Sequence, residues 1–248
     1  MSKRLIGIII IFILILILLY ILFSVNNDNS PIYYYEDIKD KLTTGDIILF
    51  SREIYDSVLD KILYDTRTKL LNSIYGHAGI ILKINNVLYI IECCGYYQTG
   101  YAHANHLNNQ KMGGVRIINL DTILKDYYKN YKGICAVKFI SREIPNSVIM
   151  QNIIKYQNMI FEKGKNVCFL AVADLLISHK FAENISKKFS DKRMFCTEFL
   201  HSLLCDCGVL KKYPSKLFWP HCITQKIFDD LEIIKYSKPY KFTFINHT

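Results

Sequence analysis

The sequence predicts an α+β fold in which an antiparallel sheet packs against helices, preceded by one N-terminal transmembrane helix. Three observations predict it: an uncharged apolar stretch near the N-terminus, a series of short β-rich segments after it, and helical periodicity further along the chain. The chain has 248 residues, of which 51% are hydrophobic and 21% are charged. This composition excludes a disordered chain and leaves room for one large domain.

The apolar stretch runs from Leu5 to Phe23 and carries neither a charge nor a polar face. As a helix it is about 28 Å long, close to the thickness of the hydrocarbon core of a bilayer. A cleaved signal peptide is the alternative, but its apolar region is normally shorter and small residues mark its cleavage site. We therefore expect an uncleaved membrane anchor.

These features divide the chain into four predicted regions. Residues 1–4 form a cytoplasmic tail, 5–23 the transmembrane anchor, 24–40 a polar stalk and 41–248 a single domain. Two basic residues precede the anchor, whereas the first charges after it are acidic. The positive-inside rule therefore predicts a single-pass protein with a cytoplasmic N-terminus and a domain outside the cell or in a lumen. If the source is a large DNA virus, the membrane is that of the virion or of the host.

Short β-rich segments bounded by turn residues predict the strands, and Asn85-Asn86 between two of them predicts a hairpin. The predicted strands are residues 42–50, 78–84, 87–93, 115–120, 134–140 and 240–245. Apolar residues at helical spacing predict helices over residues 52–74, 121–129, 146–161 and 168–177, and a helix from Cys196 onwards. Asn146 or Ser147 is expected to cap the helix over 146–161. Residues 95–114 are predicted to form a polar, aromatic loop.

The net charge of +9 is spread along the chain in short basic clusters. Such a surplus attracts anionic lipid or nucleic acid when it gathers into a patch. The sequence has no zinc-finger spacing, no RNA-binding aromatic signature and no phosphate loop. We therefore expect a solvated basic surface, no nucleic-acid partner and no cofactor, and the sequence leaves the oligomeric state open.

Eight cysteines are spaced irregularly along the domain. They are Cys93, Cys94, Cys135, Cys168, Cys196, Cys205, Cys207 and Cys222. An exported domain permits disulfides, but a domain of this size does not need them. A zinc site would use Cys205, Cys207, His221 and Cys222, which lack the paired spacings of structural zinc sites. We expect most of the cysteines to be small, buried apolar side chains.

Three separated residues carry the groups of a thiol-based active site. His77 opens a strand in Gly-His-Ala-Gly, and Glu92 ends the strand that returns from the Asn85-Asn86 turn, so both are expected near one end of the sheet. Cys196 opens an amphipathic helix in Phe-Cys-Thr-Glu-Phe-Leu, where free N–H groups and the helix dipole stabilise a thiolate. A nearby imidazole then acts as general base and general acid, and a third group orients it.

Each of these residues has a structural alternative. A lone histidine is more often a satisfied core or surface residue, and Glu92 in an apolar strand can face water or pair with a basic residue. Cys196 can be a core cysteine of an ordinary helix. His103 and His106, in the loop after Glu92, compete with His77 for a role in the site. Together, the three residues and their flanking patterns favour the catalytic interpretation.

These motifs and their order resemble the circularly permuted NlpC-like, papain-fold cysteine hydrolases, including bacterial YiiX-like proteins and their poxviral relatives. The similarity rests on Gly-Asp-Ile-Ile-Leu-Phe, then His-Ala-Gly-Ile-Ile, then a glutamate on the next strand and Phe-Cys-Thr-Glu-Phe-Leu far downstream, over about residues 43–210. In this group the histidine precedes the cysteine. The resemblance implies Cys196 as nucleophile, His77 as base and Glu92 as the residue that orients the imidazole. It also implies that backbone N–H groups at the start of the cysteine helix bind the oxyanion.

The resemblance implies a membrane-anchored thiol hydrolase or acyltransferase that acts on amide or ester bonds. The membrane anchor and the aromatic loop favour a lipid-linked acyl substrate, and a peptide or cell-wall amide is the other choice. A catalytically silent binding or envelope protein on the same fold is the first alternative, and a structural ectodomain built on disulfides is the second. The intact cysteine, histidine and glutamate favour the enzyme.

Overall fold

The computed structural model describes residues 30–55, 57–58, 61, 64–65, 68–69, 71–95, 105–106, 113–162, 170–171, 173–174 and 177–244. The described residues divide into two compact units. Tyr55–Ile74 belong to one unit, whereas Ser30–Ile54 and Tyr75–Thr248 belong to the other, which contains the sheet and the candidate site. The first unit includes helical residues within the predicted helix over 52–74.

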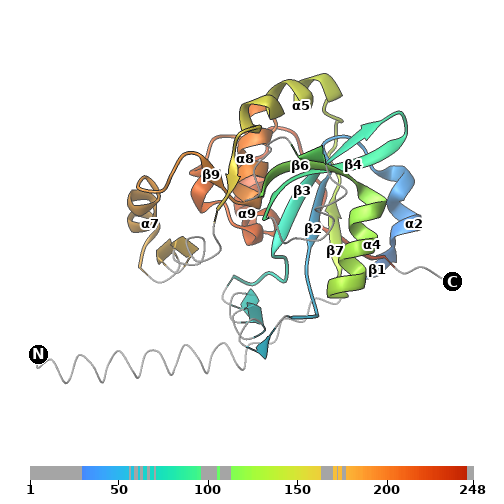
Figure 1. Ribbon diagram of the computed structural model, residues 1–248, viewed down its shortest axis with the longest axis horizontal. Helices are drawn as coiled ribbons and strands as arrows, with labels where there is room; N and C mark the ends of the chain where they lie inside the picture. The colour runs from blue at the N-terminus through green and yellow to red at the C-terminus, as the bar shows by residue number, and fades with distance from the viewer. Residues whose placement is uncertain are drawn as a thin grey trace, which may run out of the picture. The chain divides into compact units, whose positions relative to one another are not determined.

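The larger unit is built on a sheet that is mostly antiparallel (Figure 1). In spatial order its strands are β1 (Ile32–Tyr34), β10 (Tyr240–Thr243), β7 (Cys135–Lys138), β2 (Ile47–Phe50), β3 (His77–Ile84), β4 (Val87–Cys94), β6 (Gly114–Asn119), β8 (Ile160–Phe161) and β9 (Arg193–Met194), and β5 (Asn105–His106) also pairs with β6. The parallel pairs are β1 with β10 and β8 with β9. This arrangement is a mixed α+β fold with a large sheet, as the sequence predicts.

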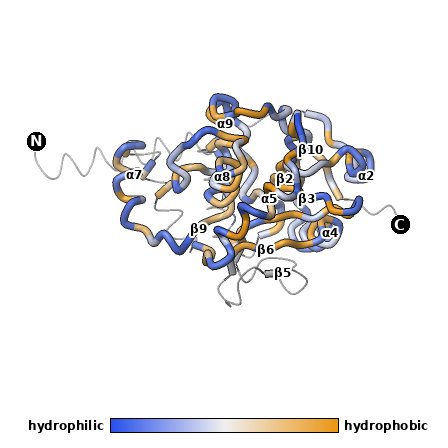
Figure 2. The backbone as a smooth tube through the Cα atoms, turned by 90° about the horizontal axis from the view of Figure 1, so that it is seen from above, coloured by the Kyte–Doolittle hydropathy of each residue, from blue (hydrophilic) through white to orange (hydrophobic). Residues whose placement is uncertain are grey.

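Some of the described helices pack on the sheet, whereas others pack on 3-10 turns. The helices are α2 (Tyr35–Ile38), α4 (Leu120–Tyr131), α5 (Asn146–Ile153), α7 (His179–Ser186), α8 (Cys196–Asp206) and α9 (Lys226–Leu231). Short 3-10 turns span Lys39–Lys41, Ile154–Tyr156, Ser215–Leu217 and Pro220–Thr224. The helix α4 packs against β4 and β6, whereas α8 packs against β3 and β4 and contacts α5. The helices α7 and α9 pack on 3-10 turns. Figures 1 and 2 place α4 and α8 on opposite sides of the strands.

The central strands follow directly from their composition. Every residue of β2 is buried, and Figure 2 shows this strand as hydrophobic. The predicted hairpin is present, because β3 and β4 pair in antiparallel register around Asn85 and Asn86. These two asparagines adopt φ values of 49° and 64°, the left-handed conformation that a two-residue hairpin turn requires. All six predicted strands have a counterpart in the structure, and the predicted helix over 121–129 lies within α4.

The turn before β2 is fixed by the carboxylate of Asp46. Its two oxygens accept hydrogen bonds from the N–H of Thr43 at 2.8 Å and of Ile140 at 2.8 Å. Burial raises the pKa of Asp46 to about 6, although these two bonds act in the opposite direction. Gly45 adopts a φ of 108°, which favours glycine at this position. The Thr-Gly-Asp sequence thus anchors the start of the central strand to the chain beyond β7.

Three sequence predictions need correction, and the first two concern the bounds of elements. The stalk predicted over residues 24–40 contains β1 and α2, and the side chains of Tyr35 and Ile38 are buried in the core with Phe242. The helix predicted over 146–161 ends much earlier, because the chain leaves α5 through a 3-10 turn and Ile160 then pairs with Gly114 of β6.

The predicted cap of that helix is also wrong. The N-cap is Pro145 rather than Asn146 or Ser147. The Asn146 side chain instead accepts a hydrogen bond from Thr44 Oγ1 at 2.7 Å and donates one to the carbonyl of Lys83 at 2.7 Å. It therefore links α5 to the central strands.

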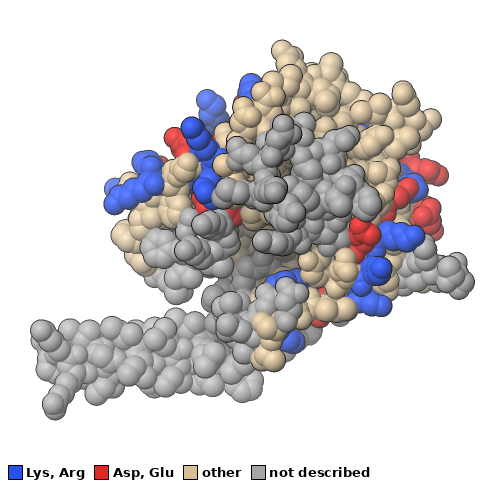
Figure 3. Space-filling view, in the orientation of Figure 1, with Lys and Arg blue, Asp and Glu red and all other residues tan. Residues whose placement is uncertain are grey.

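Among the described residues, no helix is both long enough and apolar enough to cross a membrane. The predicted anchor, Leu5–Phe23, lies outside the described residues, as does most of the predicted aromatic loop. On the face shown in Figure 3, the charged side chains of the described residues form small groups toward the left and the right of the view.

Candidate active site

His77 is held in place by the start of β3. It is the first residue of that strand and lies opposite Phe50 in the register of β2 and β3. The two rings are tilted toward each other with centroids 5.5 Å apart. The side chain of His77 is 11% exposed, so it lies at the margin of the core and not in free solution.

Glu92 on β4 connects His77 to a second cation. Its Oε2 is hydrogen-bonded to Nε2 of His77, while its Oε1 accepts bonds from Nε of Arg116 at 2.8 Å and from Nη2 at 2.5 Å. Arg116 lies directly opposite Glu92 in the register of β4 and β6, which explains how a charged pair forms inside the sheet. Both side chains are 1% exposed.

The charges of Arg116, Glu92 and His77 stabilise one another. Burial alone would raise the pKa of Glu92, but the charges of Arg116 and then His77 outweigh it and lower the pKa to about 2. Burial likewise lowers the pKa of His77, but the charges of Glu92 and Cys196, with their hydrogen bonds, raise it to about 10. The structure therefore favours a carboxylate between a guanidinium and an imidazolium at neutral pH.

Cys196 faces the same imidazole from the first turn of α8. It is the first residue of the helix, after the N-cap Phe195, and its side chain is hydrogen-bonded to His77. Because Nε2 of His77 bonds to Glu92, we expect the sulfur to meet Nδ1. The first N–H groups of a helix lack intrahelical acceptors, so this position surrounds the sulfur with partial positive charge.

The start of α8 is fixed by contacts on both sides of Cys196. The ring of Phe195 stacks on Trp219 with centroids 5.1 Å apart and an interplanar angle of 9°. The indole Nε1 donates a hydrogen bond to Asp174 at 2.9 Å. On the helix side, Thr197 Oγ1 donates to the carbonyl of Phe218 at 2.5 Å. These contacts fix the direction from which Cys196 approaches the imidazole.

Two further thiols lie on β4 next to Glu92. Cys93 and Cys94 are both fully buried, and burial raises the pKa of each thiol well above its ordinary value. Cys93 donates a hydrogen bond from Sγ to the carbonyl of Met194 at 3.4 Å. These two side chains are neutral thiols that fill the core beside the site.

The structure thus brings together all three residues that the sequence singled out, Cys196, His77 and Glu92. It also adds Arg116, which sequence reasoning missed. The available signal was a single arginine within the apolar run Val-Arg-Ile-Ile, but its partner became visible only through the strand register. His103 lies outside the described residues, and of His106 only the backbone in β5 is described.

The remaining cysteines lie elsewhere. The sulfur of Cys205 lies 3.4 Å from Nε2 of His201. This histidine was not among the residues predicted to be functional. Cys207 lies 3.8 Å from the amide of Asn152, and Cys222 lies 3.8 Å from Nε2 of His221. Within the described part of the chain the cysteines are free thiols, and no cluster of three potential metal ligands occurs there. Cys168 lies outside it.

The chain has a close viral relative. It is 41% identical over 219 residues to "Uncharacterized protein R372" of Acanthamoeba polyphaga mimivirus, a match that covers 87% of this chain and 88% of the relative. The chain belongs to the family of this mimivirus protein. No model of a known protein family matches the chain. Among solved structures, metalloprotein yiiX from Escherichia coli O157:H7 is similar over 68% of this chain and 69% of that chain, with a TM-score of 0.39 and 17% sequence identity.

Proposed function

We propose that the chain is a thiol hydrolase or acyltransferase of the permuted NlpC-like type that acts on amide or ester bonds. Cys196 is the nucleophile, His77 the general base and acid, and Glu92 the residue that orients the imidazole. The observation that carries the proposal is the position of the His77 ring, which is hydrogen-bonded both to Cys196 and to Glu92. A nucleophile, a base and an orienting group in contact are the defining geometry of such sites.

In the first half of the reaction, the Cys196 sulfur attacks the carbonyl carbon of the substrate. The sulfur–carbon bond forms while the carbonyl π electrons move onto oxygen, and N–H groups at the start of α8 stabilise that oxyanion. When the oxyanion collapses, the bond to the leaving nitrogen or oxygen breaks. The imidazolium of His77 donates its proton to this leaving group, and a thioester remains on Cys196.

In the second half, water or another acceptor gives its proton to His77 and attacks the thioester. The sulfur–carbon bond breaks and Cys196 is restored. Attack by water completes hydrolysis, whereas attack by an alcohol or amine completes acyl transfer. Throughout, Glu92 keeps Nε2 of His77 engaged, so that the opposite nitrogen stays directed at the sulfur.

The first test is the reactivity of the individual thiols. We would alkylate the full chain with iodoacetamide between about pH 5 and pH 9 and read each cysteine by mass spectrometry. Cys205 is the matched control, because it lies on the same helix and burial, with the nearby charge of Asp206, raises its pKa to about 11. We expect Cys196 to react already at the acidic end of this range, and His77→Ala to abolish that reaction.

The second test is turnover. We expect the wild-type chain to release product from acyl-lipid ester and amide reporters, with a covalent acyl group on Cys196 in the burst phase. Cys196→Ser should be inactive, whereas Cys205→Ser should retain wild-type activity. An inert Cys196, together with no turnover, would instead identify a binding or envelope protein on this fold. If the protein cleaves peptides but no acyl lipid, the proposed lipid substrate is wrong, whereas the proposed thiol hydrolase activity stands.

A further inference from the structure

A pocket of about 360 Å³ lies at the other end of the sheet, where β1 and β10 pair. It is lined by Tyr33, Asp37, Ile38, Lys41, Phe139 and Tyr240. These residues come from β1, α2, the following 3-10 turn, the segment after β7, and β10. None of them belongs to the candidate active site, so the pocket needs its own explanation.

Three aromatic rings form most of the wall. Tyr33 and Tyr240 have ring centroids 6.0 Å apart, and Phe139 meets Tyr240 edge-on with centroids 5.4 Å apart. The two tyrosines are 38% and 43% exposed, so their rings are accessible to a ligand. Aromatic walls of this kind bind quaternary ammonium groups through cation–π attraction.

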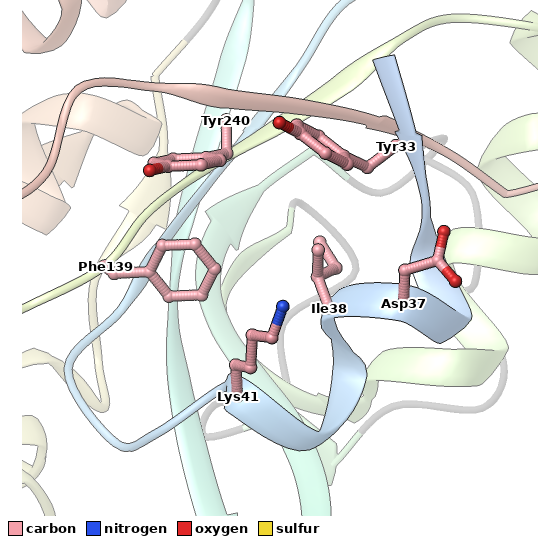
Figure 4. A pocket seen from close by; sticks show the side chains of 6 residues that line it. All are labelled: Tyr33, Asp37, Ile38, Lys41, Phe139 and Tyr240. Atoms are coloured by element: carbon pink, nitrogen blue, oxygen red, sulfur yellow. The ribbon is translucent and has the colours of Figure 1, made fainter. Parts of the chain in front are cut away.

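The pocket also carries one charge of each sign. Figure 4 shows the Lys41 amine directed from below toward the space between Phe139 and Ile38, with the two tyrosine rings above it. Lys41 has no ion-pair partner among the described residues, whereas the nearby Lys39 pairs with Asp121 at 2.8 Å. Asp37 supplies the negative charge at the edge of the wall. A ligand with an anion and a bulky cation would match both charges and the rings.

The position of the pocket in the chain indicates where such a ligand comes from. Tyr33 follows the predicted membrane anchor by only a few residues, since the apolar stretch ends at Phe23 and β1 begins at Ile32. Even fully extended, the chain between them reaches only about 30 Å. If residues 5–23 span a bilayer, this connection keeps the pocket within about 30 Å of the membrane, so that lipid headgroups are within its reach. Tyrosine side chains are enriched at the headgroup level of membranes.

We propose that this pocket binds the headgroup of a choline phospholipid in the membrane that holds the anchor. The trimethylammonium group lies against Tyr33, Tyr240 and Phe139, and the phosphate pairs with Lys41. The proposal concerns a different place from the catalytic site and stands without it.

The test uses the full chain in a maltoside detergent, which has no choline, with phosphocholine as the probe. Saturation-transfer NMR on the N-methyl protons reports binding. We expect Tyr33→Leu and Tyr240→Leu to weaken binding about fivefold each, through loss of one ring contact. Tyr34→Leu is the matched control, because neighbouring residues of a strand point to opposite faces and Tyr34 does not line the pocket. Lys41→Gln should abolish the preference for phosphocholine over tetramethylammonium.

The source of the headgroup is tested by reconstitution of the full chain into nanodiscs. In phosphatidylcholine discs the membrane should fill the pocket, so added phosphocholine should no longer bind. In phosphatidylglycerol discs the pocket should remain open, and binding should persist. Equal binding in both discs would overturn a lipid source. Absence of saturation transfer in detergent, or equal losses for Tyr34→Leu and Tyr33→Leu, would overturn the site itself.

Discussion

Arg116 donates two hydrogen bonds to the same oxygen of Glu92, from Nε at 2.8 Å and from Nη2 at 2.5 Å. The second oxygen of Glu92 remains for His77. One buried carboxylate is therefore shared between a guanidinium and an imidazole, each of which compensates part of its charge. Removing either cation leaves the other to compensate the carboxylate alone.

We expect Arg116→Met to lower the free energy of unfolding by about 3–5 kcal/mol, because it strands the buried charge of Glu92. Adding Glu92→Gln to this variant removes that charge and should restore part of the loss. Urea unfolding followed by circular dichroism measures both. The matched control is Lys155→Met, which breaks an exposed pair with Asp206 at 3.0 Å and should cost less than about 1 kcal/mol. Similar losses for Arg116→Met and the control would contradict the prediction.

The raised pKa of His77 predicts a loss of stability at alkaline pH. Its pKa is about 10 in the folded chain, compared with the ordinary 6.5. The folded state therefore holds this proton more tightly, so the stabilisation is complete below pH 6.5 and is lost as the pH rises toward 10. Unfolding free energies measured across this range should fall more steeply for the wild-type chain than for His77→Gln. If the unfolding free energies of the two proteins change with pH in parallel, the pKa of His77 is not raised in the folded chain.

Trp219 is expected to position the nucleophile through its stack on Phe195. Trp219→Phe keeps an aromatic ring against Phe195 and loses the hydrogen bond to Asp174. We therefore expect the free energy of unfolding to fall by about 1 kcal/mol. Alkylation of Cys196 should proceed at a near-normal rate. Trp219→Leu removes the stack and should slow that alkylation as well. The rate ratio of Cys196 to Cys205 in each variant is the measurement. An unchanged ratio in Trp219→Leu would exclude a positioning role.

Gly79 is predicted to tolerate no side chain. A Cβ at this position would lie 2.6 Å from Cδ1 of Ile90 and 3.0 Å from the carbonyl oxygen of Ile91. We expect Gly79→Ala to lower the free energy of unfolding by about 1–3 kcal/mol through overpacking. Ile90→Ala removes both of the closest atoms, Cδ1 at 2.6 Å and Cγ1 at 2.7 Å, so the double variant should lose less than the sum of the two single losses. Additive losses in urea unfolding would rule out this clash as the cause.

The parts of the fold that the sequence predicted are those set by local chemistry. Asn85 and Asn86 accept positive φ more readily than most residues, so the hairpin, and with it the proximity of His77 and Glu92, follows from a short stretch of chain. The opening of α8 at Cys196 follows in the same way from helical spacing.

The parts that the sequence did not predict depend on distant pairing. Arg116 meets Glu92 only because β6 pairs with β4 in one particular register. The early end of α5 depends on Ile160, whose strand partners are Gly114 and Arg193. The burial of Tyr35 depends on Phe242, almost at the other end of the chain. No local pattern encodes such contacts.

The pairing of β1 with β10 sets the order in which the protein can be completed during synthesis. β1 is the first strand of the sheet to leave the ribosome and β10 is the last, and β10 lies between β1 and β7. While the chain is being made, β1 therefore has no partner and β7 has an open edge. This half of the sheet closes only once β10 has left the ribosome, so a chain that stops before Tyr240 would leave unpaired edges on β1 and β7 in an otherwise assembled domain.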